Sequence, residues 1–301
     1  MQQELQPIAL RNIPFAITFG NHDNQAGISN AEQMPIYESY AQFVGGGEYA
    51  YGPGTYSVPI YDDAGQTVVF VLYLIDSGGD AEAGGYEPVS EDIIHWYRSE
   101  RDRYAAVNGN QVVPALVFQH IPLPEYYAVL KRVKPWTRGA VRTFRTHKNE
   151  LYVLPPEGGQ PNDFFTESSS IPDINSGEFD AFSERGDVLG IYVGHDHGNS
   201  FVRKYRGIDL GYTQSSGFNE YGPGTLRGVR VIELDEENIR QYQTHTITFR
   251  QMFGRKLARP FLDLVYRHFP TSMDNALYYL PRYGLAALVA IGAIVGLIIL
   301  L

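Results

Sequence analysis

The sequence predicts an α/β fold in which strand ends carry metal-capable side chains. Apolar runs at residues 13–19, 112–119 and 188–193 have the length and the β-branched or aromatic content of buried strands. Segments with helical spacing, at residues 31–43 and 90–106, lie between the first run and the second. A histidine follows each apolar run within three residues. Three strand-like runs therefore end in side chains that bind metals or transfer protons.

Local signals define the other expected elements. Residues 55–61 and 67–75 are expected to form two strands joined by a turn. Ser90 is expected to cap the helix that ends near Ala106. Residues 134–172 are weakly patterned, so we expect a long surface excursion near the site. Further expected elements are a short helix at residues 122–133, a helix at 176–185, antiparallel strands within 201–249 that include 228–234 and 244–249, and an amphipathic helix at 253–269.

Composition limits the classes of partner and site. The formal net charge is -10 and the isoelectric point is near 5.3, which argues against a nucleic-acid partner because a phosphate backbone needs a basic face. If such a chain handles phosphate, a metal must supply the positive charge. There is no cysteine, so disulfides and thiolate metal sites are excluded. Metal ligands must therefore be histidine, asparagine, aspartate or glutamate.

The end of the chain has the composition of a membrane anchor. Residues 284–301 contain no charged or polar side chain, and their length is near the lower limit of the roughly 17–25 residues that cross a bilayer. We therefore expect a domain at residues 1–250, an amphipathic juxtamembrane segment at 251–277 and a transmembrane helix at 278–301, with a buried core helix as the alternative. The interfacial side chains before the apolar run are Tyr278, Tyr279, Arg282 and Tyr283.

Two weaker patterns concern the partners of this anchor. Gly292 and Gly296 form a G-x-x-x-G pair, which predicts that two anchors pack together as a homodimer in the lipid bilayer. Arg267 and Arg282 lie before the anchor, so the positive-inside tendency favours a cytoplasmic domain.

Gly194-His195-Asp196-His197 is the most informative motif. Its two histidines stand one residue apart, directly after the apolar run at residues 188–193. The Asn-His-Asp run at residues 21–23 follows a second strand-like run, and His120 follows a third. A site that activates water toward a phosphate ester needs neutral imidazole and oxygen ligands held rigidly at strand ends.

In their order and surroundings, these three motifs resemble the calcineurin-like metallophosphoesterase family. The residues around His120 and at 198–201 are most similar to the branch of purple acid phosphatase 29 and Dcr2-like phosphatases. The resemblance covers residues 13–234. It implies a four-layer α/β/β/α sandwich, here lacking its first strands, and a metal-dependent phosphoesterase, with phosphomonoesters favoured over phosphodiesters.

The resemblance also implies a role for each motif residue. Asn21, His120 and His195 match ligands of the second metal in the family, and His197 matches a ligand of the first metal. Two metal ions are therefore implied. Histidine with amide and carboxylate oxygens suits Fe, Zn or Mn.

Two further residues match the part of the motif that acts on the substrate. His22 matches the histidine that contacts the substrate phosphate and helps to protonate or stabilise the leaving oxygen. Asp23 is expected to orient His22. Asp196 is expected to point outward at the strand end and to act structurally. The histidines without such context are expected to be ordinary; they are His95, His147, His245 and His268.

Two motifs of the family pattern do not precede Asn21 in this sequence. They are an Asp-x-His motif and a Gly-Asp motif whose aspartate bridges the metals. Without them the first metal keeps one ligand, His197, and the second metal loses its bridge. We therefore expect that the chain is the C-terminal majority of a longer enzyme, and that it is inactive or nearly so alone. The alternatives are a non-catalytic membrane-attached binding module with a degraded site, and a metal-binding surface protein without phosphate chemistry.

Overall fold

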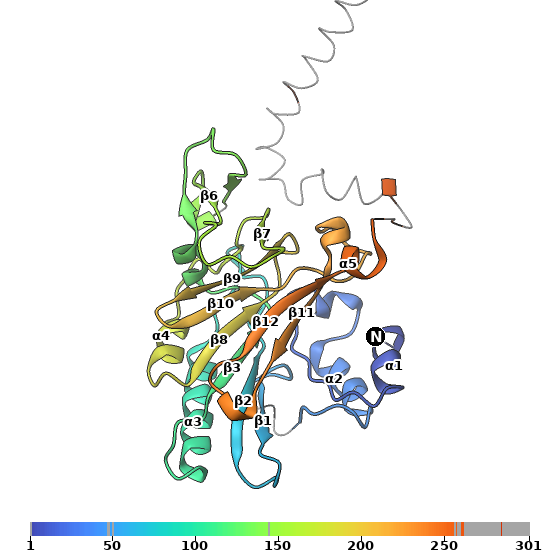
Figure 1. Ribbon diagram of the computed structural model, residues 1–301, viewed down its shortest axis with the longest axis vertical. Coiled ribbons are helices and arrows are strands. Elements are labelled where there is room, and N and C mark those ends of the chain that lie inside the picture. Colours follow the sequence, from blue (N-terminus) through green and yellow to red (C-terminus); the bar gives the residue numbers. More distant parts are fainter. Residues whose placement is uncertain are drawn as a thin grey trace, which may run out of the picture.

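A seven-stranded mixed sheet forms the centre of the fold (Figure 1). The computed structural model describes residues 2–46, 49, 51–143 and 145–255, together with the single residues 257, 260, 261 and 284. In sheet order, the central strands are β1 (Tyr56–Tyr61), β2 (Val68–Ile75), β3 (Ala115–Gln119), β8 (Val188–Val193), β10 (Ile208–Tyr212), β9 (Asn199–Tyr205) and β7 (Phe164–Phe165).

Four neighbouring strands of this sheet run parallel. β2 pairs with β3, β3 pairs with β8, and β8 pairs with β10 in parallel register. β1 and β9 add to this group by antiparallel pairing, and β7 pairs antiparallel with β9. The carboxyl ends of the four parallel strands therefore lie along one edge of the sheet, where open α/β folds bind their ligands.

Smaller sheets and helices surround the central sheet. β11 (Gly228–Glu233) pairs with β12 (Gln243–Thr248), and a separate small sheet contains β4 (Lys131–Arg132), β6 (Leu151–Val153) and β5 (Val141–Arg142). The described α-helices are α1 (Gln2–Ala9), α2 (Asn30–Glu38), α3 (Glu91–Val107), α4 (Glu178–Ser183) and α5 (Phe249–Phe253). The short 3-10 helices are Asp23–Ala26, Pro124–Val129, Arg145–His147, Gly224–Leu226 and Glu236–Asn238.

Alternation of side chains along β2 separates two cores. Tyr73 points to the face of the sheet that α3 and α4 cover, and its ring meets Tyr97 of α3 at 5.1 Å. Phe70 points to the opposite face, where it lies in one cluster with Ile232 of β11. Leu74, on the same side as Phe70, packs in a cluster with Met34 of α2. The predicted mixed α/β architecture with a central sheet is therefore confirmed, with helices on one face and the β11–β12 pair beside α2 on the other (Figure 1).

The prediction of a strand at residues 13–19 is wrong, because this segment does not pair along its length with a neighbouring strand. This segment forms a single bridge, between Phe15 and Phe43. Side chains satisfy its backbone instead: the Tyr56 hydroxyl accepts from the amide of Ile17 at 2.8 Å and contacts the carbonyl of Ile17 at 2.5 Å. The Thr18 hydroxyl donates to the carbonyl of Ile75 at 2.9 Å. Of its apolar side chains only Phe19 is buried, whereas Ile13 is 47% exposed, so the burial expected of a core strand is found only at the end of the segment.

Other expected elements are found with shifted ends. β1, β2, α3 and β8 match their predictions within two residues, and the Ser90 hydroxyl caps α3 by accepting from the amide of Ile93. The helix predicted at residues 122–133 is a 3-10 helix followed by β4, because Pro124 begins it and the chain becomes extended at Leu130. The helix predicted at residues 31–43 ends at Glu38, and α1 was not predicted.

The predicted membrane segments lie mostly outside the described residues. Within the part of the chain that the structure describes, no helix has the length and apolar character needed to cross a membrane. The transmembrane prediction at residues 278–301 falls outside that part apart from Gly284, and so do Gly292 and Gly296. The juxtamembrane prediction at residues 251–277 is described only as far as Arg255 and at isolated positions beyond it.

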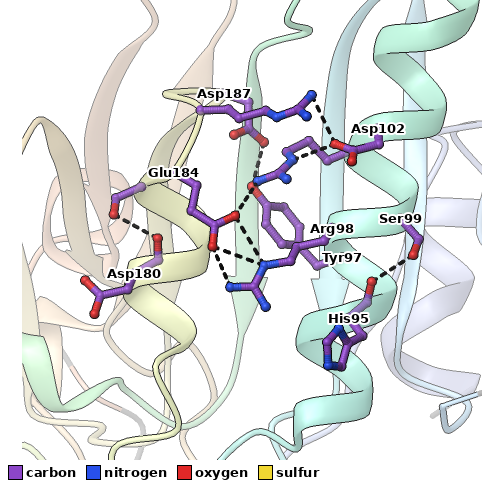
Figure 2. Close-up of polar contacts among 11 residues, drawn as sticks. His95, Tyr97, Arg98, Ser99, Asp102, Asp180, Glu184 and Asp187 are labelled. Atoms are coloured by element: carbon purple, nitrogen blue, oxygen red, sulfur yellow. Dashed lines mark hydrogen bonds and ion pairs between the residues drawn. The ribbon is translucent and has the colours of Figure 1, made fainter.

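Polar contacts fix α4 and the start of β8 against α3 (Figure 2). Glu184, at the end of α4, accepts hydrogen bonds from Arg98 at 2.5 Å and from Arg101 at 3.1 Å. Asp187, which precedes β8, is 1% exposed and accepts a hydrogen bond from the Tyr97 hydroxyl at 2.6 Å. The other carboxylate oxygen of Asp187 has no hydrogen-bond partner. Tyr97 is therefore the main polar support of a buried carboxylate.

We predict that Tyr97→Phe lowers the free energy of unfolding by about 1–3 kcal/mol at pH 7, the usual cost of a buried group left unpaired. Burial raises the pKa of Asp187, so its folded pKa lies above the ordinary carboxyl value of 3.8. The penalty should be present above that folded pKa and should shrink as the pH falls through it. Denaturant unfolding at several pH values measures it. Tyr61→Phe, at a side chain 48% exposed, is the control; an equal effect there would contradict the prediction.

Candidate functional site

A cleft with a volume of about 1070 Å³ lies at the carboxyl edge of the parallel strands. Its walls come from the turn after residues 13–19, the loop after β2, the ends of β3 and β8, the loop after β10, and the excursion at residues 134–172. The prediction that this excursion lies near the site is confirmed. Side chains lining the cleft include His22, Asp23, Asp80, Tyr86, His120, Arg145, Glu167, His195, Asp196, His197 and Tyr221.

Three of the four predicted metal ligands meet at this edge. The Nε2 atom of His120 lies 3.1 Å from Asn21 Oδ1 and 3.1 Å from His195 Nδ1. Two ligand atoms of one tetrahedral zinc ion lie about 3.3 Å apart, given metal–ligand bonds of about 2.0–2.1 Å. Both measured separations therefore fit ligand atoms that share one metal ion.

The register of β3 and β8 brings the two histidines together. Gln119 pairs with Val193 at the strand ends, and the amide of Gly194 donates to the carbonyl of His120 at 3.2 Å. His195 has a φ of 62°, a left-handed conformation that is uncommon for residues other than glycine. The chain turns there, and the ring of His195 meets that of His120 edge-on at 4.9 Å. Such local strain is concentrated at functional sites.

Asn21 reaches the histidines because Gly20 leaves room for them. A Cβ atom at Gly20 would come within 2.9 Å of the His120 ring. Asp80 accepts a hydrogen bond from Asn21 Nδ2 at 3.4 Å, which turns the amide oxygen of Asn21 toward His120. Tyr86, in the same loop as Asp80, meets the ring of His195 edge-on at 4.5 Å. The loop after β2 therefore supports both Asn21 and His195.

The environment keeps these histidines neutral. Burial, together with the neighbouring His195 and His197, lowers the pKa of His120 to about 3. Burial also lowers the pKa of His195 to about 4, with a contribution from His197. Neutral imidazole is the form that binds metals, because the lone pair must be free of a proton. Both imidazoles are therefore uncharged at neutral pH, and a metal ion at His120 Nε2 would displace the proton that this atom donates to Asn21 Oδ1.

His197 contacts Tyr221 rather than the other three predicted ligands. Its Nδ1 atom donates to the carbonyl of Tyr221 at 3.0 Å, and its ring stacks on that of Tyr221 at 4.3 Å. In the neutral ring this hydrogen bond leaves the lone pair on Nε2. Arg227, which is 1% exposed, donates to the carbonyls of Gly217 and Glu220 and so holds the loop that carries Tyr221.

His22 lies in the cleft, but its predicted partner is different. The Oε1 atom of Gln25 lies 3.0 Å from His22 Nδ1. The Asp23 carboxylate instead accepts from the amide of Gly20 at 2.6 Å and closes the turn that begins there. The expectation that Asp23 orients His22 is therefore not the arrangement found, because the turn draws its carboxylate back toward the backbone.

Asp196 is structural, as expected, but it does not point outward. It is 2% exposed, accepts from the Tyr212 hydroxyl at 2.5 Å and accepts from the amide of Ser170 at 3.1 Å. Glu167 accepts from the Tyr221 hydroxyl at 2.6 Å and from the amide of Gly198 at 2.9 Å. Burial raises the pKa of both carboxyls, and their mutual repulsion adds to the effect on Glu167.

Asp80, Tyr86, Glu167 and Tyr221 were not predicted as part of the site. Asp80 lies in a glycine-rich loop that follows a buried strand, and this position was the available signal. Glu167 has no local signal, since it belongs to a weakly patterned segment. Among the described residues, no three histidine, aspartate or glutamate side chains cluster closely enough to hold a metal ion. A metal ion held by His120 and His195 would therefore need the amide oxygen of Asn21 as a third ligand.

Comparison with known proteins shows which proteins this chain is similar to. No family model matches the chain. The chain is 29% identical over 260 residues to probable inactive purple acid phosphatase 14 of Arabidopsis thaliana, covering 79% of this chain and 58% of that protein. It is 27% identical over 249 residues to probable inactive purple acid phosphatase 29 of the same plant, covering 76% and 57%. Its homologues are purple acid phosphatase-like proteins.

The purple acid phosphatase-like relatives include phosphatase DCR2 of Saccharomyces cerevisiae, which is 26% identical over 257 residues covering 80% of this chain and 40% of that protein. The predicted resemblance to the calcineurin-like metallophosphoesterase superfamily is confirmed. The chain spans less than two thirds of the length of these relatives.

We predict that Gly20→Ala displaces the His120 ring and lowers the free energy of unfolding by about 1–3 kcal/mol, as overpacking of a tight contact does. The His120 ring resonances report the displacement, and denaturant unfolding reports the stability. Gly79→Ala is the control, because a Cβ there meets nothing within 4 Å. Unchanged His120 resonances in Gly20→Ala would show that the contact does not position the ring.

Proposed function

We propose that this chain is a metal-dependent phosphoesterase domain that favours phosphomonoesters, and that Asn21, His120 and His195 hold one metal ion. The convergence of the three ligand atoms carries the proposal, because His120 Nε2 lies 3.1 Å from each of the other two. Two neutral imidazoles and an amide oxygen suit Fe, Zn or Mn. The proposed fold is the family's four-layer sandwich, of which the helical layer and two sheets are described.

The charge of the cleft explains why a metal would be needed. Its described lining includes the acidic side chains of Asp23, Asp80, Glu167, Asp196 and Glu220, against the single cation Arg145. A metal ion bound here supplies positive charge for the phosphate oxygens and lowers the pKa of water. The residues of the chain would hold and orient the substrate around it.

Two histidines would act beside this ligand group. His22 lies in the cleft with its Nδ1 held by Gln25, so its Nε2 is the atom proposed to contact the substrate phosphate and the leaving oxygen. His197 would offer Nε2 to a second metal, since Tyr221 occupies its Nδ1. The proposal includes attachment to a bilayer through residues 278–301, which their apolar sequence supports.

A non-catalytic module with a degraded metal site is the second candidate. It is favoured by the hydrogen bond of His197 to Tyr221 rather than to the other three predicted ligands, and by the names of two relatives, which are called probable inactive phosphatases. The Asp-x-His and Gly-Asp motifs of the family pattern do not precede Asn21 in this sequence. Metal and phosphate binding separate the two candidates.

We predict that His195→Ala weakens the binding of Mn²⁺ or Zn²⁺ by at least about 100-fold, because changes to residues that merely support ligands already cost about 10–100-fold. Isothermal titration calorimetry on metal-free protein measures the affinity. His95→Ala removes an exposed histidine of α3 and should leave the affinity unchanged. Equal affinities for the parent and His195→Ala would exclude this metal site.

Phosphate binding should depend on the bound metal. Inorganic phosphate is expected to bind the metal-loaded protein and not the metal-free protein, as followed by calorimetry. Hydrolysis of p-nitrophenyl phosphate should fall far below ordinary turnover of about 1–1000 per second, because His197 is the one residue of this sequence proposed to bind a first metal. Ordinary turnover that His195→Ala abolishes would contradict the expected weak activity. Metal binding without phosphate binding would favour a module without phosphate chemistry.

A further inference from the structure

A second, much smaller cavity lies behind the end of β3. Its volume is about 10 Å³, which is the space of one water molecule or one ion. Its lining comes from Ser77 and from residues within 87–89, 119–125 and 172–178. It shares no lining residue with the large cleft, and the proposed phosphoesterase function does not use it.

Three acceptor oxygens around this cavity have no hydrogen-bond partner. They are Gln119 Oε1, Glu125 Oε2 and Glu178 Oε1, and all three atoms are buried. The side chains of Gln119 and Glu178 belong to residues that are only 5% exposed. Native proteins rarely leave such atoms unpaired, because each has lost its bonds to water. Three orphaned acceptors at one ion-sized cavity therefore require a common partner.

Neighbouring contacts hold two of these oxygens in place. Gln119 Nε2 donates to the carbonyl of Ile121 at 2.9 Å, which fixes the amide and leaves its oxygen as the free atom. Asn175 Nδ2 donates to Glu125 Oε1 at 2.7 Å, so the other carboxylate oxygen of Glu125 remains unpaired. The acceptors are thus held by the surrounding fold rather than displayed on mobile side chains.

The charge around the cavity points to a cation. Three carboxylates line it, those of Glu87, Glu125 and Glu178, and none of the described lining residues is lysine, arginine or histidine. Burial raises the pKa of Glu178 to about 8; the amide of Gln119 lowers it and the charge of Glu125 raises it. A bound cation would offset both the burial of charge and the repulsion between the carboxylates of Glu125 and Glu178.

A proton or a water molecule satisfies fewer of these atoms than a cation does. One proton joins two oxygens, and one water molecule donates two hydrogen bonds. A cation contacts all three oxygens together. Calcium takes carboxylate, amide and carbonyl oxygens in flexible geometry, whereas magnesium demands near-ideal octahedral geometry. The three side-chain oxygens would supply part of the calcium ligand shell.

We propose that Gln119, Glu125 and Glu178 form a structural calcium site. A bound ion would join three elements: the end of β3 through Gln119, the 3-10 helix Pro124–Val129 through Glu125, and α4 through Glu178. Gln119 directly precedes His120, so the ion would also brace the strand end that carries this histidine.

Calcium titration of the full, chelator-treated chain tests the proposal at pH 8. Ca²⁺ should bind the parent with one-to-one stoichiometry in calorimetry and raise its Tm in proportion to the logarithm of concentration. Glu178→Gln and Glu125→Gln keep the side-chain shape but remove a charge, and each should weaken Ca²⁺ binding at least tenfold. Asp180→Asn, at an exposed position of α4, should bind as the parent does.

The His195→Ala variant tests whether Ca²⁺ binding depends on the large cleft. Calcium binding that survives in His195→Ala and is lost in Glu178→Gln supports the site. If Ca²⁺ has no effect on the parent, the calcium site is excluded. If, in addition, Glu178→Gln is more stable than the parent at pH 8, the occupant of the cavity is a proton. Calcium binding that Glu178→Gln and Glu125→Gln both leave unchanged would also overturn it.

Discussion

The parallel pairing of β3 with β8 is the constraint on which the candidate site depends. Because Gln119 and Val193 are paired at the strand ends, the residues that follow them are forced into contact. Strand spacing then places His120 and His195 within 3.1 Å of each other with no long loop to position them. Two strands buried on both faces supply the rigidity, and only Asn21 must be brought in from elsewhere.

Carboxamides have a similar part at both proposed metal sites. Asn21 completes a pair of histidines, and Gln119 completes a pair of carboxylates. In each case a second hydrogen bond of the amide nitrogen, to Asp80 or to Ile121, determines where the oxygen points. An amide adds a ligand oxygen without adding charge, which limits the repulsion within a buried group.

Sequence reasoning was successful where the signal is local. Apolar runs predicted β2 and β8, a capping serine predicted the start of α3, and the histidine motifs predicted three side chains that do meet. It failed where the outcome depends on a distant partner. The apolar run at residues 13–19 has the composition of a strand, but whether it joins a ladder depends on neighbouring strands that its own composition does not reveal.

The same reason explains why the direction of Asp196 was wrongly predicted and why Glu167 was missed. Asp196 is buried because Tyr212 and Ser170 pair with it, and Glu167 matters because it holds Tyr221. These partners are up to 54 residues apart in the chain, and no spacing rule connects them. Pattern identifies residues whose chemistry is unusual, whereas the network that supports them becomes visible only when the chain is folded.

Arg227 links the β11–β12 pair to the loop that follows β10 of the central sheet. This arginine ends the short helix before β11, and it holds the loop on which Tyr221 stacks against His197. The β11–β12 pair is therefore more than a cover for one face of the central sheet. Arg227, which directly precedes β11, also supports one wall of the cleft. A movement of the β11–β12 pair would therefore shift Tyr221 and the imidazole of His197 while the parallel strands stay in place.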